Sequence, residues 1–237
     1  MVIKWISRAG GRPENEDFYG HTRKKGITCV VVADGLGGHS GGEIASRLTV
    51  NTILGEFEKE PGFSKEHIER YINTAKDTVV NKAMNDPLLL HMSSTVVVLL
   101  IKGRRAMWAN VGDSRIYKLY EGSITDVSED HSLAFLDFAR GTIEYNDIRT
   151  SPNQNKLISA IGVSMDGMNI SEPATAGIGS AFVLCTDGWW EYVTEQDMEE
   201  TYKNSSNIHD WLKRMIEIRE EKAPKDSDNY TAMVVMV

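Results

Sequence analysis

The chain has 237 residues, of which 41% are hydrophobic and 25% charged, and its formal net charge is −8. This balance is typical of a globular protein with a substantial core, and the negative charge argues against nucleic acid as the main partner, because that binding depends on basic patches. No apolar run is long enough to cross a bilayer and the first residues lack the pattern of a signal peptide, so we expect a cytoplasmic protein without membrane insertion.

The first half of the chain predicts one strand followed by two helices. An apolar run at residues 27–33 is typical of a covered strand, and helical patterns follow at about 42–58 and 65–85. Pro61 and Gly62 separate the two helices, which favours an antiparallel pair. Ser64 is the predicted N-cap of the second helix. The apolar stripe of that helix comprises Ile68, Tyr71, Ile72, Ala75, Val79 and Met84.

Further apolar runs predict strands at residues 95–101, 106–111, 115–119, 181–185 and 231–237. The Glu-Gly pair within residues 117–125 predicts a hairpin turn. Residues 140–170 are polar and turn-rich, which indicates a long excursion, and a third helix is expected at 208–222. Strands grouped on either side of helices favour sheets that pack on each other and are covered by helices. Cys29 and Cys185 lie in apolar runs and are interpreted as reduced core thiols.

The stretch TCVVVADGLGGHSGGE, residues 28–43, ends an apolar run on Asp34 and continues into five glycines. A carboxylate at the end of a buried strand needs water or a cation nearby, because an unpaired charge is costly to desolvate. A Walker loop is excluded because it requires Gly-Lys-Ser/Thr, and the dinucleotide fingerprint fails because Ser40 stands in its last glycine position. The stretch therefore favours a metal site over a nucleotide loop.

Two other aspartates have the setting of Asp34. AFVLCTDG repeats the apolar strand followed by Asp-Gly and places Asp187 at its end, and Asp228 precedes the final strand. Oxygen ligands of this kind select hard cations such as Mg²⁺ or Mn²⁺. The sequence offers no Cys/His cluster with zinc spacing and no EF-hand loop, the pattern of a structural Ca²⁺ site.

Seven motifs along the chain carry a family resemblance. They are RPENED (12–17), VVADGLGGHSGGE (31–43), STVVVLLI (94–101), ANVGDSR (109–115), NKLISAIG (155–162), LCTDG (184–188) and DNYT (228–231). Their order resembles that of the metal-dependent type 2C protein serine/threonine phosphatases in their compact bacterial form. The resemblance implies one phosphatase domain over residues 1–237 and an α+β fold. That fold is a four-layer α-β-β-α sandwich of two antiparallel β-sheets flanked by antiparallel helix pairs, with a flap at about 140–170.

The resemblance also implies a set of metal ligands. Asp34 would bridge two Mn²⁺ or Mg²⁺ ions, and the carbonyl of Gly35 would bind one of them. Asp187 and Asp228 would hold the other ion. Asp113 matches the acid that, with Asp187, helps to hold a third metal in bacterial relatives.

The same resemblance implies how phosphate is bound and attacked. Glu16 and Asp17 would position the metals or their waters, and Arg12 matches the arginine that clamps the substrate phosphate, which suits its forked donors. Two cations lower the pKa of a bridging water, so that hydroxide can attack phosphorus in line. We therefore expect Arg12, Asp34 and Asp187 to be catalytic.

Two positions depart from the family pattern. Leu36 stands where many eukaryotic members carry a proposed general-acid histidine. Either a metal-bound water or His39, three residues further on, would then protonate the leaving group, and we favour the water. Trp189 and Trp190 stand where many relatives carry Leu. We favour packing against the helix expected from Thr194, and the alternative is that one of them shapes the substrate lip.

The leading hypothesis is an enzyme that hydrolyses phosphoserine and phosphothreonine in proteins, as the counterpart of a cognate serine/threonine kinase. The alternative from another class is a catalytically weak regulatory module of the same fold that binds phosphoproteins, and loss of a metal acid would be its sequence signature. A third interpretation is a metal-dependent hydrolase of small phosphate esters or nucleotides.

Overall fold

The structure is a computed structural model that describes residues 1–37, 41–162 and 165–237. The strands are β1 (Val2–Arg8), β2 (Phe18–Lys24), β3 (Ile27–Ala33), β4 (Gly35–Leu36), β5 (Ser93–Ser94), β6 (Val96–Lys102), β7 (Arg105–Val111), β8 (Arg115–Tyr120), β9 (Ser123–Val127), β10 (Asn169–Ile170), β11 (Ala174–Thr175), β12 (Ser180–Cys185) and β13 (Tyr230–Met236). The α-helices are α1 (Gly41–Lys59), α2 (Lys65–Met84), α3 (Leu133–Ala139), α4 (Asp187–Trp190), α5 (Glu195–Lys203) and α6 (Ile208–Lys222). Short 3₁₀ helices are η1 (Pro87–Leu89) and η2 (Tyr145–Thr150).

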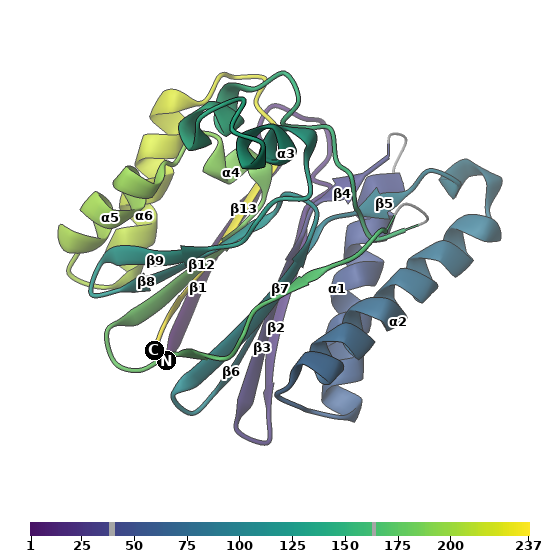
Figure 1. Ribbon diagram of the computed structural model, residues 1–237, viewed down its shortest axis with the longest axis horizontal. Coiled ribbons are helices and arrows are strands. Elements are labelled where there is room, and N and C mark those ends of the chain that lie inside the picture. Colours follow the sequence, from purple (N-terminus) through teal and green to yellow (C-terminus); the bar gives the residue numbers. More distant parts are fainter. Residues whose placement is uncertain (38–40, 163–164) are drawn as a thin grey trace.

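The strands form two main sheets that lie face to face between helices (Figure 1). One sheet has the order β1-β13-β12-β8-β9, and the other has the order β10-β7-β6-β3-β2, with β11 also paired to β7. Every pair in both sheets is antiparallel. Helices α1 and α2 cover the outer face of the second sheet, and α5 and α6 cover that of the first. The predicted α-β-β-α sandwich is therefore confirmed.

Three apolar layers explain why the central strands have continuous apolar sequences. On β3, Cys29 and Val31 pack toward α1 and α2, whereas Val30 and Val32 face the other sheet. On β12, Val183 likewise packs toward the α5–α6 layer and the alternate residues pack between the sheets. Successive side chains of a strand point to opposite faces, so a strand covered on both faces needs an apolar residue at every position.

The first helix pair follows the prediction except at one end. The Ser64 side chain accepts a hydrogen bond from the His67 amide and caps α2, as expected. Met84, predicted on the apolar stripe, is 71% exposed, and Ala83 is buried in its place. Ala83 lies four residues after Val79 and so returns to the buried face, which a residue five positions on does not.

The hairpin and the two thiols also follow the prediction. Glu121 and Gly122 join β8 to β9 with positive φ values of 50° and 79°, which is the geometry of a tight hairpin turn. Cys29 and Cys185 are both free and fully buried. Among the helices that the structure describes, none is long and apolar enough to cross a membrane.

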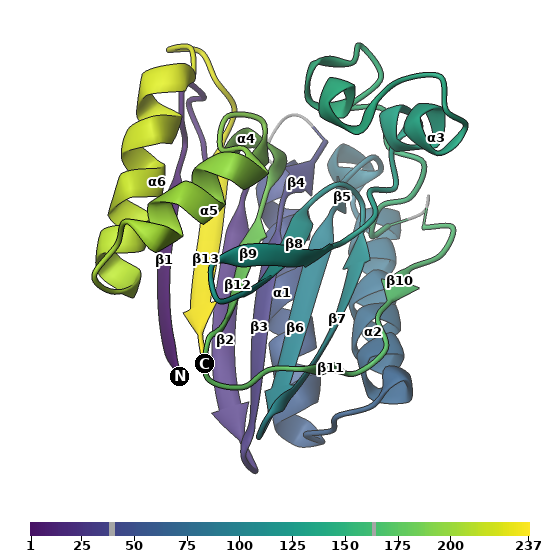
Figure 2. The ribbon, with the colours of Figure 1, turned by 60° about the vertical axis from the view of Figure 1, so that its left-hand side comes forward.

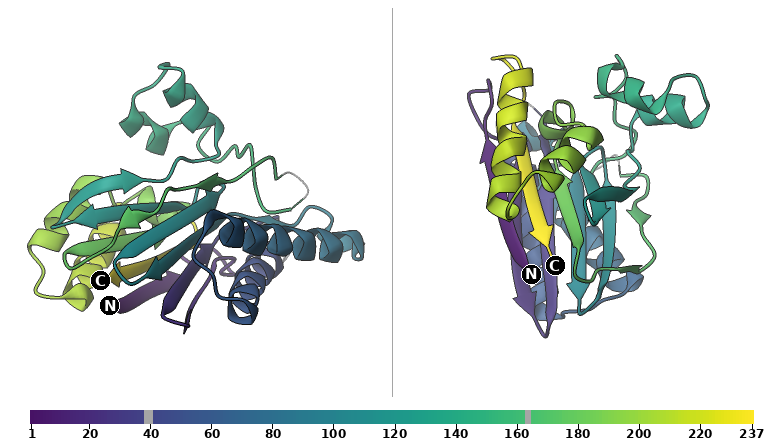
Figure 3. Two further views of the ribbon diagram at one scale, coloured as in Figure 1. Left: turned by 60° about the horizontal axis from the view of Figure 1, so that its bottom comes forward. Right: turned by 90° about the vertical axis from the view of Figure 1, so that its left-hand side faces the viewer.

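The segment between β9 and β12 contains more structure than its sequence indicates. It carries α3, capped by Ser132, and η2, and both stand apart from the two sheets (Figures 2 and 3). Helix α3 begins at Leu133, before the predicted start of the excursion at residue 140. The division into one domain with a flap at about 140–170 stays a prediction.

Candidate metal centre

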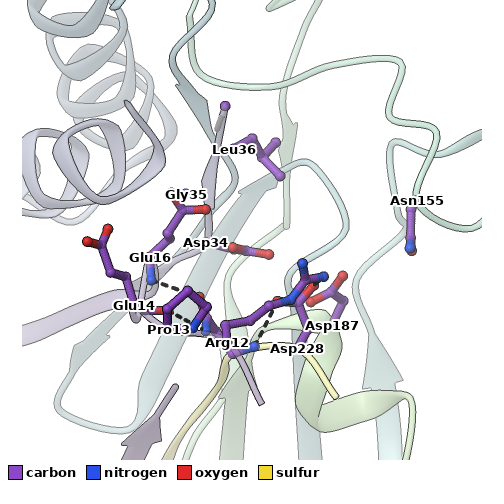
Figure 4. A pocket seen from close by; sticks show the side chains of 12 residues that line it. Arg12, Pro13, Glu14, Glu16, Asp34, Gly35, Leu36, Asn155, Asp187 and Asp228 are labelled. Carbon is purple, nitrogen blue, oxygen red and sulfur yellow. Dashed lines mark hydrogen bonds and ion pairs between the residues drawn. The ribbon is translucent and has the colours of Figure 1, made fainter. Parts of the chain in front are cut away.

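A pocket of about 450 Å³ opens at one edge of the sandwich, and three aspartates line it (Figure 4). Asp34 directly follows β3, Asp187 follows β12, and Asp228 precedes β13. Because β12 and β13 are antiparallel neighbours, the end of one and the start of the other meet at the same edge. The described lining residues are Arg12, Pro13, Glu14, Glu16, Asp34, Gly35, Leu36, Gly37, Asn155, Asp187, Asp228 and Asn229.

The backbone of Asp34 is fixed from the neighbouring strand. Its amide donates to Thr95 Oγ1 at 3.0 Å, and its carbonyl accepts from the Thr95 amide and from Ser94 Oγ, both at 2.8 Å. At Gly35 an added Cβ would lie 2.1 Å from the carbonyl oxygen of Gly42, so only glycine fits. The carboxylate of Asp34 therefore projects from a turn that has little freedom.

The carboxylates of Asp187 and Asp228 are each held by the backbone amide of the following residue. Asp187 Oδ1 accepts the amide of Gly188 at 2.6 Å, and Asp228 Oδ1 accepts the amide of Asn229 at 2.8 Å. Asp228 Oδ2 accepts from Nη2 of Arg12 at 2.9 Å, and both side chains are about half exposed. The predicted phosphate-binding arginine therefore lies beside the predicted metal acids.

Asp17 is more buried than the acids that line the pocket and is 5% exposed. Its Oδ2 accepts from Thr186 Oγ1 at 2.9 Å, whereas Oδ1 is buried and has no hydrogen-bond partner among the described residues. Glu16 lines the pocket, and its amide donates to the Asn229 side chain at 2.8 Å. A Cβ on Gly42 would lie 2.7 Å from the Glu16 carboxyl carbon, so this glycine makes room for the carboxylate.

The acids raise one another's pKa values. Burial, followed by repulsion from Asp187, Asp17 and Asp113, raises the pKa of Asp34 well above its ordinary value. Burial and then Asp228 raise the pKa of Asp187 to about 6. Burial also raises the pKa of Asp113, with Asp187 as the next cause.

The described acids of the pocket are not yet arranged as a complete metal-binding site. In residues 1–37, 41–162 and 165–237, no three Asp, Glu, His or Cys side chains are already gathered around one metal position. Crowded carboxylates with an unpartnered buried oxygen on Asp17 are nevertheless the hard donors that a divalent cation would stabilise. The residues present therefore fit Mn²⁺ or Mg²⁺.

The metal-free protein should lose stability between pH 5 and pH 7. Burial raises the pKa of Asp17 and of Glu191 to about 7 and that of Asp187 to about 6. The folded protein then binds these protons more tightly than the unfolded chain does, so its stability falls as the groups ionise. For Asp187 alone the loss between pH 5 and pH 7 is about 1.4 kcal/mol, because its pKa lies about one unit above pH 5 and one unit corresponds to about 1.4 kcal/mol. Burial lowers the pKa of His131, which acts in the opposite direction.

Urea denaturation in EDTA across this pH range measures the effect. Saturating Mn²⁺ and the variant Asp187→Asn should each flatten the curve. A stability that rises steadily from pH 5 to pH 7 in EDTA would contradict the prediction.

Several predicted residues lie outside the pocket wall. Asp17 and Asp113 are buried behind it, at 5% and 4% exposed. Trp189 and Trp190 are buried in the core on the α5–α6 side, so the packing interpretation is confirmed and the substrate-lip alternative is wrong. His39 lies outside the described residues, so the choice between a metal-bound water, which we favour, and His39 as the general acid stays open.

Two pocket features were missed from the sequence. Asn155 comes from the polar segment after η2 and lies across the pocket from Arg12 (Figure 4). The side-chain amide of Asn229 donates to the carbonyls of Ala9 and Glu14 at 2.8 and 2.9 Å, which ties the N-terminal loop to the turn of Asp228. Asn155 and Asn229 belong to the motifs NKLISAIG and DNYT, but the sequence of a motif does not show which of its side chains reach the pocket.

Known proteins resemble this chain in sequence and in fold. The serine/threonine phosphatase stp of Listeria welshimeri is 29% identical over 234 residues, which cover 94% of this chain and 90% of that protein. The crystal structure of the Mycobacterium tuberculosis serine/threonine phosphatase PstP/Ppp has a TM-score of 0.87 at 23% identity, covering 100% and 99% of the two chains. The catalytic domain of PstP in complex with two manganese ions has a TM-score of 0.84 at 23% identity, covering 98% and 96%.

The family model described as protein phosphatase 2C matches residues 8–227. The chain therefore belongs to the protein phosphatase 2C family. The predicted family is confirmed, and with it the prediction of a protein serine/threonine phosphatase.

Proposed function

We propose that this chain hydrolyses phosphoserine and phosphothreonine in proteins, with two Mn²⁺ or Mg²⁺ ions held by the acids of its pocket. The observation that carries the proposal is the meeting of Asp34, Asp187 and Asp228 with Arg12 in one pocket. The family and the two manganese ions of the PstP structure support it. Magnesium as the ion in the cell and a third ion near Asp113 belong to the proposal only.

Each acid has a position that suits a ligand. Asp34 follows β3 of the second sheet and lines the same pocket as Asp187 and Asp228 of the first, so it would be shared by both ions, with the Gly35 carbonyl as a further ligand of one. Asp187 and Asp228 would hold the other, because the amides of the next residues fix their Oδ1 atoms. When bound, the cations supply an activated water and positive charge beside the phosphoryl oxygens. Asp113 would help Asp187 to hold a third ion.

Arg12 would bind the substrate phosphate. Its interaction with Asp228 uses Nη2, and a guanidinium has four further N–H donors in a planar fork that suits phosphate oxygens. Glu16 and Asp17 would orient the metals or their waters. Leu36 at the pocket wall cannot donate a proton, so water within the pocket is our proposed proton source for the leaving alkoxide.

The binding-module alternative is disfavoured because every predicted metal acid is present. Phosphoproteins are the substrate class that the family name implies. A cognate serine/threonine kinase and a cytoplasmic location stay predictions.

The test is phosphate release from a phosphothreonine peptide, with Mn²⁺ and with EDTA, by the wild-type chain and by Asp187→Asn. We expect release that requires Mn²⁺ and falls by about 100-fold or more in the variant, as when a group that stabilises transition-state charge is removed. Nucleotides assayed in parallel should be poorer substrates. No release by a folded, Mn²⁺-loaded wild type would favour the binding module instead, and faster turnover of nucleotides would favour the small-phosphoester enzyme.

A further inference from the structure

Arg219 is a buried cation on an otherwise apolar helix face. It is 4% exposed and lies on α6 in the same stripe as Trp211, Leu212 and Met215. Burying a guanidinium carries a large desolvation penalty unless its donors are satisfied. A residue of this kind on a core stripe needs a reason other than apolar packing.

The partners of Arg219 are the oxygens of two turns. Its Nε donates to the carbonyl of Gly188 at 3.1 Å, and its Nη2 donates to Ser227 Oγ at 2.8 Å and to the carbonyl of Asp228 at 3.3 Å. Its guanidinium carbon lies 3.7 Å from the ring centroid of Tyr230. Among the ion pairs of the described residues, none includes Arg219.

The two turns that Arg219 joins are those of the metal acids. Gly188 directly follows Asp187, and the second turn contains Asp228 itself. The turns also touch each other, because a Cβ on Gly188 would lie 2.1 Å from the carbonyl oxygen of Asn229. A single planar guanidinium therefore bridges these two carboxylate-bearing turns, in addition to the pairing of β12 with β13 beside them.

Arg219 acts from behind the site. Arg219 is not among the described residues that line the pocket of Asp34, Asp187 and Asp228. It lines a separate pocket with Arg8 and Tyr230. It therefore does not contact the substrate, and any effect on the reaction passes through the two turns. Lysine would not replace it, because one ammonium group lacks the planar fork that reaches both turns at once.

We propose that Arg219 is a positioning residue that holds Asp187 and Asp228 at the separation needed to bind a divalent cation. The inference rests on the proposed function, since it assumes that these two acids are metal ligands. It predicts weaker metal binding when the guanidinium is lost, even where the fold persists. Groups that orient metal ligands typically contribute about 10- to 100-fold to metal affinity.

The experiment is calorimetric titration of the EDTA-stripped protein with Mn²⁺, for the wild type, Arg219→Lys and Arg219→Met. Met215→Ala is the matched control, because it removes a fully buried side chain one turn earlier on α6 that belongs to the core cluster. We expect Mn²⁺ affinity to fall about 10- to 100-fold in both Arg219 variants. In Met215→Ala we expect a lower melting temperature but an affinity close to that of the wild type.

Peptide hydrolysis gives a second readout. The Arg219 variants should need more Mn²⁺ for half-maximal rate and should recover most of the wild-type rate at saturating Mn²⁺. Wild-type affinity in Arg219→Lys, or an equal loss in Met215→Ala, overturns the proposal. So does failure of both Arg219 variants to fold while Met215→Ala folds, since the role of Arg219 is then global packing. A wild type that binds no Mn²⁺ contradicts the proposed function itself.

Discussion

Asp34→Asn is expected to reduce metal-dependent hydrolysis strongly and, at the same time, to stabilise the metal-free protein. The activity should fall by about 100- to 1000-fold, because a group that organises transition-state charge is removed. Without metal at pH 7.5, however, the Asp34 carboxylate is half-buried and lies among the acids Asp187 and Asp17, and its raised pKa means that its ionisation destabilises the fold. Asparagine keeps the shape and the backbone bonds to Thr95 but carries no charge.

Thermal denaturation in EDTA and in Mn²⁺, together with phosphate release, measures both effects. The melting temperature of Asp34→Asn should exceed that of the wild type in EDTA. Added Mn²⁺ should raise it less than in the wild type, since ligand binding to the folded state stabilises it by an amount that grows with the logarithm of the affinity. Asp77→Asn is the control, because Asp77 is exposed on α2 and the chemical change is identical. A variant that is less stable than the wild type in EDTA would contradict the claim that the Asp34 charge destabilises the metal-free protein.

Asp130→Asn should destabilise the protein by about 3–5 kcal/mol, the usual penalty for leaving a buried charge without its partner. Arg115 Nε and Nη2 donate to the two oxygens of Asp130 at 2.9 and 2.7 Å, and both side chains are 2% exposed or less. The next carboxylate, that of Glu195, is 4.0 Å from Arg115 Nη1. The guanidinium also lies 3.7 Å from the ring centroid of Trp190.

Urea denaturation of Asp130→Asn and Asp126→Asn tests this difference. Asp126 pairs with Lys118 on the same hairpin, but its side chain is 47% exposed. Its variant should change stability by less than about 1 kcal/mol, as is usual for surface ion pairs. Equal losses in the two variants would show that the buried pair contributes no more than the exposed one. Because Trp190 also donates to the carbonyl of Asp113, at 2.9 Å, phosphate release should be measured alongside.

The central strands could be predicted from the sequence because both of their faces are buried. Residues 27–33 are apolar except for Thr28, residues 181–185 are apolar throughout, and the structure buries all of them inside the sandwich. The first two strands, β1 and β2, were missed. Both are edge strands with exposed and half-exposed residues, so their sequences VIKWISR and FYGHTRK carry no apolar run. Their place depends on pairing with β13 and β3, which no local pattern records.

The acids of the site could be predicted because each follows or precedes an apolar strand. Asp34, Asp187 and Asp228 meet in one pocket as expected. Asn155 could not be predicted, because it belongs to a polar segment whose path depends on tertiary contacts. Arg219 left a signal in the sequence, because in the helix expected at 208–222 this charged residue lies four positions after Met215 and so on the same face as Trp211 and Met215.

The burial of the two thiols determines which reagents can inactivate this phosphatase. Cys29 and Cys185 are fully buried in apolar surroundings, and burial raises the pKa of both thiols above its ordinary value. Alkylating agents and peroxides react with exposed thiolates, which these residues do not present. They are also the only cysteines in the sequence. Oxidants that inactivate enzymes with a nucleophilic cysteine therefore find no such cysteine on the surface of the folded protein. Inhibition is expected instead from chelators that remove the metal.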